Sequence, residues 1–450
     1  MATTSTKPSV SFIGLGAMGF GMATHLVKQG YRVTGFDVWE PTLSRFVAAG
    51  GLSASTPASA VRDSPLCVVM VATAAQADSV LFSGDAPAAA ALPQGAILLL
   101  CSTVPCAYVQ GLATRLRPDV RLADCPVSGG AARAADGTLS IMAGGSEEAL
   151  SAAMELLREL ADPAKLYVVA GGVGAGSNMK MCHQVLAAVQ ILAASEGMGF
   201  AARLLGSPAT TLPRARDAVL GSPESWAWMF ENRVPRMLEK EGLGVPVASA
   251  LTIIVKDAGI ITSEARRRGF ATPMTSVAEQ VYFAGVGRGW GADDDSSMIR
   301  LYTEGEGKVG PVSATDYDDE GKLKLVLALL KGIYLCAAAE AIAFAKRCQL
   351  DLDQVYELCV NAAGGSTVFK NVGPEMMKLC RGEALVALEG GESLGDLERQ
   401  LQEAVAEAQR LKVPVFLGSQ ALSLIRLALQ HAPTNVEKLP RAAVTTLWGL

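Results

Sequence analysis

The residues best suited to chemistry in this 450-residue chain stand in one segment, 174–184. A glycine turn opens it, and an apolar pattern then predicts a long helix from about Ala175 to Leu205. On that helix Lys180, His183 and Gln184 stand at positions i, i+3 and i+4, which places all three on one face. A lysine whose pKa is lowered by burial and a neighbouring positive charge can take the proton of an alcohol while a hydride leaves. The alternative is a lysine that only extends its ammonium group into solvent at a helix start.

A second candidate is the loop Asp124-Cys125-Pro126-Val127-Ser128-Gly129-Gly130, which follows an expected strand at Val120–Ala123. The Ser128 hydroxyl and the amides of Gly129 and Gly130 could together bind a small carboxylate. On composition alone, an ordinary turn is the alternative.

The N-terminal segment has the pattern of a dinucleotide site. An expected strand, Val10–Ile13, runs directly into Gly14-Leu15-Gly16-Ala17-Met18-Gly19. A helix pattern then continues to a stop at Gln29-Gly30, and a second expected strand, Arg32–Phe36, ends at Asp37. A glycine turn in an unrelated α/β protein is the alternative, but the flanking strand, helix and acid all favour the nucleotide site.

Each part of this turn has a physical reason. Gly14 makes the tight turn, Gly16 lets the backbone approach a pyrophosphate, and Gly19 lets helix and strand pack closely. The pyrophosphate would lie at the helix N-terminus, beside the amides of the whole turn, including Leu15, Ala17 and Met18. Asp37 has the spacing of the acid that binds a ribose 2′-hydroxyl, and its charge would repel a 2′-phosphate, so we expect NAD rather than NADP.

Two further strands are expected at 66–71 and 96–100. Thr103 follows the second, at a strand end where α/β sheets bind ligands, and is a candidate to line a nicotinamide pocket. The alternative for Ser102 and Thr103 is capping of the next helix.

Composition limits the remaining possibilities. The net charge is −5 and the charges are scattered, which does not favour binding to nucleic acid or an acidic membrane. Nine cysteines without a C-x-x-C pair and three histidines predict no metal site and free thiols in a reducing compartment. The first strand begins too early for a cleaved leader, so we expect a cytoplasmic protein. The apolar run 323–345 is interrupted by charges and predicts a buried helix, not a membrane span.

Four motifs, taken in order, resemble those of the β-hydroxyacid dehydrogenase family, which includes 3-hydroxyisobutyrate, tartronate semialdehyde and 6-phosphogluconate dehydrogenases. They are the turn 14–19, the loop 124–130, the segment 174–180, and Lys256-Asp257. The resemblance covers residue 9 to about residue 305. It implies NAD-dependent oxidation of a small hydroxy acid, or the reverse reduction of the oxo acid.

The resemblance also implies roles for individual residues. Lys180 would be the general acid/base, and the loop at Ser128, Gly129 and Gly130 would hold the substrate carboxylate. A polar residue one turn after the lysine would bind substrate, which assigns the substrate hydroxyls to His183 and Gln184. Lys256 would stand at the edge of the active site, near both cofactor and substrate; a surface ion pair with Asp257 is the alternative.

Departures from the common pattern narrow the choice of substrate. Gln184 stands where most members have Asn, and the Lys-x-x-His-Gln pattern is similar to the L-threonate dehydrogenase branch. Ala187 and Ala188 replace the Glu and Tyr of 6-phosphogluconate dehydrogenases, which argues against decarboxylation. Two rivals stay open. One is a biosynthetic-pathway reductase of a bulkier carbonyl substrate; the other is a non-catalytic NAD-binding module, against which the retained Lys180 argues.

The helical segment 183–290 is expected to recur at about 325–430. The pattern that begins at Phe230 returns at Phe369, and the one that begins at Glu196 returns at Glu340. In this second copy Lys324 stands where Lys180 does.

The rest of the site is not repeated. Leu327 and Ala328 replace His183 and Gln184, and Arg399-Gln400 replaces Lys256-Asp257. The second copy is therefore expected to be catalytically silent.

We therefore expect an α/β Rossmann-type domain followed by two all-α domains that arose by duplication. The predicted boundaries are 1–170, 171–305, a linker at 306–322, and 323–450, and the Gly/Asp/Ser-rich composition extends the linker prediction to the whole segment 285–321. The duplication would place the twin of the helical domain in the same chain. The expected state is a monomer with an internal pseudo-dimer, or a homodimer.

Overall fold

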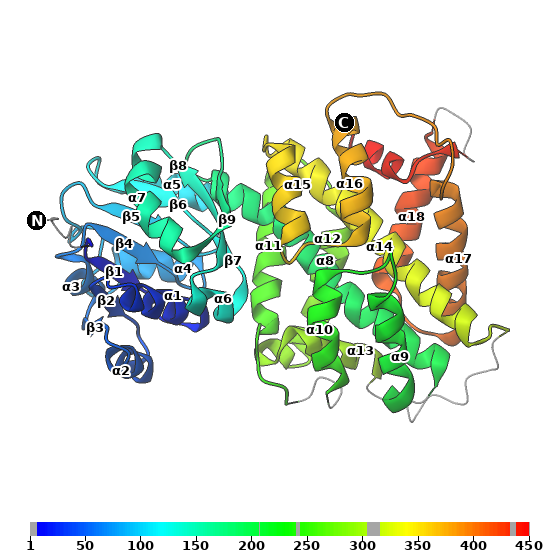
Figure 1. Ribbon diagram of the computed structural model, residues 1–450, viewed down its shortest axis with the longest axis horizontal. Helices are drawn as coiled ribbons and strands as arrows, with labels where there is room; N and C mark the ends of the chain where they lie inside the picture. The colour runs from blue at the N-terminus through cyan, green and yellow to red at the C-terminus, as the bar shows by residue number, and fades with distance from the viewer. Residues whose placement is uncertain (1–6, 207, 240–243, 304–315, 433–437, 450) are drawn as a thin grey trace, which may run out of the picture. The chain divides into compact units, whose positions relative to one another are not determined.

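The computed structural model describes residues 7–206, 208–239, 244–303, 316–432 and 438–449. The chain forms two compact units, Met1–Lys180 and Met181–Leu450. The described part of the first unit contains a sheet flanked by helices, and that of the second is helical (Figure 1). The division falls inside the long helix α8 (Ala175–Leu205), whose bounds agree with the helix predicted from sequence.

The sheet of the first unit has the strand order β3-β2-β1-β4-β5-β6-β8-β7, with β9 beside β8. Strands β1 to β6 pair in parallel, and β6 pairs with β8 in the antiparallel sense. The first six strands have the order of a dinucleotide-binding fold, in which ligands bind at the carboxyl ends of the strands. The bounds are β1 Val10–Ile13, β2 Val33–Phe36, β3 Leu52–Ser53, β4 Leu66–Val69, β5 Ile97–Leu100, β6 Arg121–Asp124, β7 Val127–Ser128, β8 Leu139–Gly145 and β9 Ala161–Val168.

Helices cover both faces of this sheet, which is why β1, β4 and β5 are continuous buried runs. Phe12 and Leu99 point into one core, while Cys67 and Leu98 point into the other. The helices are α1 Ala17–Lys28, α2 Glu40–Ala48, α3 Pro57–Val61, α4 Ala74–Asp78, the π-helical turn Ser79–Ser83, α5 Cys106–Arg115, α6 Gly130–Asp136 and α7 Glu147–Leu160.

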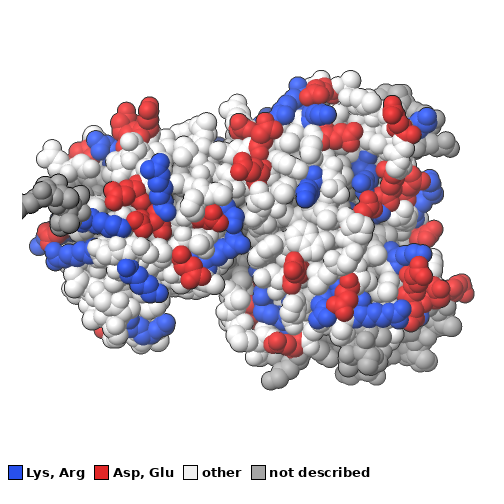
Figure 2. All heavy atoms as spheres, viewed as in Figure 1, with Lys and Arg blue, Asp and Glu red and all other residues white. Residues whose placement is uncertain are grey.

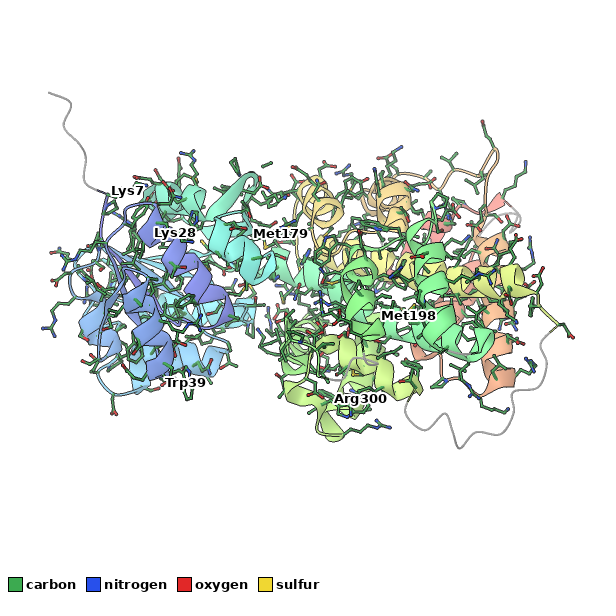
Figure 3. All side chains as sticks on the ribbon, turned by 60° about the horizontal axis from the view of Figure 1, so that its bottom comes forward. Lys7, Lys28, Trp39, Met179, Met198 and Arg300 are labelled. Atoms are coloured by element: carbon green, nitrogen blue, oxygen red, sulfur yellow. The ribbon has the colours of Figure 1, made fainter. Side chains whose placement is uncertain are left out.

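The second unit is built around two long apolar helices, α8 and α14 (Asp319–Arg347). Both are long and apolar enough to cross a membrane, but their apolar windows are 100% and 94% buried in the structure. Met198 of α8, labelled in Figure 3, has no exposed surface. The other helices are α9 Pro208–Leu220, α10 Trp228–Leu238, α11 Leu251–Arg267, α12 Pro273–Gly287, α13 Arg300–Thr303, α15 Leu352–Asn361, α16 Thr367–Cys380, α17 Leu394–Leu411, α18 Phe416–Gln430 and the 3₁₀ segment Arg441–Trp448.

Contacts inside the helical unit occur in reciprocal pairs. The chain before α10 and the chain before α16 form an antiparallel bridge at Ala227 and Ser366. Trp228 donates its backbone N–H to Gly365 at 2.8 Å, and Thr367 donates to Trp226 at 3.0 Å. These paired contacts give the helical unit an internal pseudo-two-fold relation.

The linker expected from composition begins too early. Helix α12 includes Gly285, and two 3₁₀ turns follow at Trp290–Ala292 and Asp295–Ile299. Asp295 is fully buried because Arg233 binds both of its carboxylate oxygens, at 2.9 and 2.8 Å. Acidic residues that suggested a solvated linker are thus part of the folded core, since a buried arginine compensates their charge. Residues 304–315 of the predicted linker lie outside the described residues.

Charged side chains on the face shown in Figure 2 are intermixed in sign. All nine cysteines are buried free thiols. Among the described residues, no group of three or more His, Cys, Asp or Glu side chains could hold a metal ion.

Candidate active site

The glycine turn after β1 has the geometry that its sequence predicts. Gly14 has a φ of 95°, and a Cβ there would lie 2.3 Å from the Met70 carbonyl oxygen. A Cβ on Gly19 would lie 2.0 Å from the Gly14 carbonyl oxygen. At Gly16, by contrast, a Cβ would meet no atom within 4 Å. Two glycines are therefore required by packing, while the third leaves open space beside the backbone.

This open turn fits a dinucleotide. Gly16 precedes the first turn of α1, where no side chain caps the helix amides. Asp37 follows β2 and accepts hydrogen bonds from the backbone N–H groups of Leu15, at 2.7 Å, and Trp39, at 2.9 Å. The carboxylate thus fixes the glycine turn to the end of β2. An uncapped helix N-terminus suits a pyrophosphate, and an acid at the end of β2 suits a ribose diol.

Ser102 and Thr103 follow β5, at the carboxyl edge of the sheet. The Ser102 hydroxyl accepts the backbone N–H of Val71 at 2.9 Å and thereby joins the ends of β4 and β5. Helix α5 has Pro105 at its N-cap and no side-chain cap, so the capping alternative is wrong for Ser102. Thr103 is partly buried on this loop and stays a predicted cofactor residue.

The Ser-Gly-Gly loop lies between β7 and α6. Ser128 is buried and pairs with Ser140 of β8. Gly129 and Gly130 have φ values of 140° and 78°, which side-chain-bearing residues rarely adopt. A Cβ on Gly130 would meet nothing within 4 Å, so the backbone is open at this point. The loop can therefore present bare amides beside a hydroxyl.

Sequence reasoning assigned no role to Asp124, which the structure places at the end of β6, in contact with the start of α8. Its fully buried carboxylate accepts the backbone N–H of Ser177 at 2.7 Å and the Ser177 hydroxyl at 2.8 Å. Burial raises the pKa of Asp124 to about 7, against the opposing effect of the bonds from Ser177 and Gly174. The position of Asp124 at the end of a buried strand, within the substrate-loop motif, was the signal that could have revealed this role.

The same contact fixes the start of α8 and with it Lys180. A Cβ on Gly176 would lie 2.3 Å from the Met142 carbonyl oxygen and 2.4 Å from that of Asp124. Only glycine lets α8 start this close to β6 and β8. Lys180 is the last residue of the first unit and is 5% exposed. Lys180 is therefore buried, whereas the alternative expected its ammonium group to extend into solvent.

The second unit contains the other predicted residues. His183 and Gln184 are buried on α8, and the His183 Nδ1 atom lies 3.1 Å from Gln184 Oε1. The Gln184 amide nitrogen donates to Asp257 Oδ2 of α11 at 2.5 Å. Lys256 forms an ion pair with Asp257 Oδ1 at 3.0 Å. Lys256 does form an ion pair with Asp257, as the alternative expected. Asp257, however, is buried and hydrogen-bonded to Gln184 of α8, so the pair is not a surface pair.

Comparisons with known proteins identify the family of both parts of the chain. Residues 9–172 match the family model described as the NAD binding domain of 6-phosphogluconate dehydrogenase. The model described as NAD-binding of NADP-dependent 3-hydroxyisobutyrate dehydrogenase matches twice, at 174–302 and at 321–438. Fold and site thus define an NAD(P)-binding oxidoreductase.

One curated relative is an L-threonate dehydrogenase from Cupriavidus necator, 37% identical over 295 residues, which are 65% of this chain and 96% of the relative. The chain belongs to the β-hydroxyacid dehydrogenase family, as its motifs predicted.

Two solved structures extend the comparison. A 3-hydroxyisobutyrate dehydrogenase from Salmonella typhimurium is 32% identical, with a TM-score of 0.60, over 66% of this chain and 100% of that chain. The 6-phosphogluconate dehydrogenase of Plasmodium falciparum matches 95% of this chain and 93% of its own, with a TM-score of 0.67 and 16% identity. At that identity the second likeness concerns the fold alone, and it includes both helical copies.

Proposed function

We propose that this protein oxidises a small hydroxy acid with NAD, or reduces the corresponding oxo acid in the reverse direction. The observation that carries the proposal is the buried Lys180 on α8, a helix whose start is held to β6 by the bonds between Ser177 and Asp124. The named relatives are hydroxy acid dehydrogenases, which favours this function over a reductase of bulkier carbonyl compounds or a non-catalytic module.

The cofactor would bind at the turn 14–19 with its pyrophosphate at the N-terminus of α1, near Thr103 at its nicotinamide end. When bound, it accepts the hydride from the carbinol carbon. Asp37 favours NAD because a carboxylate at the end of β2 accepts hydrogen bonds from a ribose diol and repels a 2′-phosphate. Asp37 is already held in place by two backbone N–H groups, so it is preorganised for this choice.

The proton would be taken by Lys180. Oxidation of the carbinol group of a sugar acid or a 3-hydroxy acid removes a hydride from carbon and a proton from oxygen, so that CH–OH becomes C=O. The neutral amine accepts the hydroxyl proton in this direction, and the ammonium returns it in the reverse one. Ser128, Gly129 and Gly130 would hold the carboxylate, and His183, Gln184 and Lys256 would contact the rest of the substrate.

The Lys-x-x-His-Gln pattern favours a sugar acid such as L-threonate, which has further hydroxyls beside the reacting one. We also propose that the chain works in the cytoplasm, as a monomer with an internal pseudo-dimer or as a homodimer, with domain boundaries near residues 170, 305 and 323. The double match of one family model and the reciprocal contacts of the helical unit support this organisation.

The test is the rate of NADH or NADPH formation with L-threonate and with 3-hydroxyisobutyrate. We expect turnover of L-threonate, with NAD preferred over NADP. An Asp37→Ser variant should lose much of that preference and keep its turnover with saturating NAD. Cofactor binding without turnover of any C3 to C6 hydroxy acid would contradict the proposal.

A further inference from the structure

A chain of polar contacts joins α11 to the face of α8 that follows Lys180. Lys256 pairs with Asp257 at 3.0 Å, Asp257 accepts from Gln184 at 2.5 Å, and Gln184 lies 3.1 Å from His183 Nδ1. His183 and Asp257 are 0% and 5% exposed, and Gln184 is 9% exposed. Because water does not reach these groups freely, the direction of each hydrogen bond is set by its partners.

That direction can be derived one group at a time, starting from the carboxylate. Asp257, ion-paired with Lys256, can only accept, so the NH₂ group of Gln184 must face it. The other end of the same amide is a carbonyl oxygen, which also can only accept, and it faces His183. The His183 Nδ1 atom must therefore carry a proton. A neutral imidazole carries one N–H, so its Nε2 atom is then an acceptor.

We propose that Asp257 is a positioning residue: acting through Gln184, it holds His183 as the Nδ1–H tautomer, so that Nε2 accepts a hydrogen bond from a substrate hydroxyl. The proposal rests on the proposed function for its substrate. His183 stands three residues after Lys180 and so lies on the same face of the helix, one turn further on. The hydroxyl that it contacts is one that does not lose the hydride.

This arrangement gives specificity for acids with several hydroxyls. L-Threonate has two hydroxyls besides the reacting one, whereas 3-hydroxyisobutyrate has only the reacting one. A site that accepts a hydrogen bond from a substrate hydroxyl binds a substrate without that hydroxyl more weakly, because this bond is not formed. Asp257 therefore acts on the choice of substrate and leaves the proton transfer to Lys180.

The first test reads the tautomer directly and needs no substrate. The chain has only three histidines, so nitrogen NMR of protein labelled with ¹⁵N-histidine gives few signals, and a His183→Asn variant identifies those of His183. We expect the Nδ1–H tautomer for His183 in the wild type at pH 8. Asp257→Leu, which cannot accept from Gln184, should shift it toward the Nε2–H tautomer, while Asp257→Asn, which can accept through its carbonyl oxygen, should largely preserve it.

The second test is kinetic. Asp257→Leu should lower kcat/KM for L-threonate about tenfold more than for 3-hydroxyisobutyrate, which corresponds to one hydrogen bond of about 1.4 kcal/mol. Asp257→Asn should restore most of the difference. If Asp257→Leu does not fold, as melting curves would show, the Asn variant and the wild-type spectrum still decide the matter.

The two tests separate the possible failures. An Nε2–H tautomer in the wild type overturns the inference whatever the enzyme does. An equal loss for both substrates assigns Asp257 a structural role only and also overturns it. An Nδ1–H tautomer in a protein that turns over no hydroxy acid would contradict the proposed function and the substrate role of His183, but not the orienting contact itself.

Discussion

The two helical copies keep the same supporting contacts and differ in their chemistry. Glu196 of α8 accepts the backbone N–H groups of Leu417 and Gly418, at 3.0 and 2.8 Å, at the start of α18. Its counterpart Glu340 of α14 accepts those of Met274 and Thr275, at 2.7 and 3.0 Å, at the start of α12. Each copy thus caps a helix of the other with a fully buried carboxylate.

The positions predicted to act in catalysis or substrate binding in the first copy carry different residues, or differ in exposure, in the second. Lys180 is 5% exposed, whereas the side chain of Lys324 is 72% exposed and pairs with Glu320. Beside Lys324, a pocket of about 570 Å³ is partly lined by Leu327 and Ala328, the residues that replace His183 and Gln184.

Lys331, which replaces Ala187, also lines this pocket and belongs to a cluster of charged side chains. Its ammonium group contacts Glu224 at 3.2 Å and Gln400 at 3.1 Å, and also binds Glu392. Gln400 is the counterpart of Asp257, so the position that we propose orients His183 in the first copy contacts the Lys331 ion cluster in the second.

This difference shows which residues the fold itself requires. Helix termini buried inside the unit need acceptors or donors wherever they occur, so the capping glutamates are needed in both copies. A proton-transfer site is needed only where a cofactor domain supplies the reaction. The second copy can therefore lose its site and still complete the core of the first.

The largest expected effect is a loss of activity that distinguishes Lys180 from its counterpart Lys324. Lys180→Met should lower kcat/KM about 10²- to 10⁴-fold, because the proton acceptor is lost. Lys324→Met, the matched control, should leave the rate within twofold, since its side chain lies in solvent. Steady-state NADH formation measures both; comparable losses in the two variants would show that the second copy is not silent.

An intermediate effect, on stability, is expected at Glu196 and Glu340, the two glutamates that each cap a helix of the other copy. Glu196→Gln and Glu340→Gln should each destabilise the helical unit by about 1–3 kcal/mol, because a glutamine offers one acceptor oxygen to two buried N–H groups. Calorimetric unfolding measures the change. Similar losses of unfolding free energy in the two variants would support the pseudo-two-fold relation. A loss in only one variant would contradict it.

The same variants have a predicted pH dependence. Burial raises the pKa of both Glu196 and Glu340 to about 7, although the backbone N–H groups oppose the shift. The native state therefore binds these protons more tightly than the unfolded chain does, and the stability from both groups falls as the pH rises from about 4.5 to about 7. The deficit of each Gln variant relative to wild type should be largest near pH 5 and smaller at pH 8. Melting temperatures across this range test the sign.

The smallest effect is expected at the ion cluster. Lys331→Met should cost about 1 kcal/mol, because Arg441 still faces Glu224 and Glu392 and compensates part of their charge. Activity should not change. A change in kcat/KM for either substrate would indicate that the pocket of the second copy influences the first.

Local patterns determined much of this protein. The bounds of β1 and α8, the packing of Gly14 and Gly19, and the order of the four motifs could all be predicted from sequence, because they depend on short-range sterics and periodicity. The duplication was also visible in sequence, since Glu196 and Glu340 recur with the same neighbours. Composition alone misjudged 285–303, where Asp295 is buried against Arg233 from a distant helix.

Only the tertiary structure decided how the site is held. Asp124 contacts Ser177, and Asp257 contacts Gln184, across 53 and 73 residues of chain. Neither pairing leaves a periodic or local signal, because a carboxylate that accepts a buried N–H can come from any segment that the fold brings near. The sequence thus determined which residues could do the chemistry, and long-range burial, which requires every polar group to find a partner, decided which residues orient them.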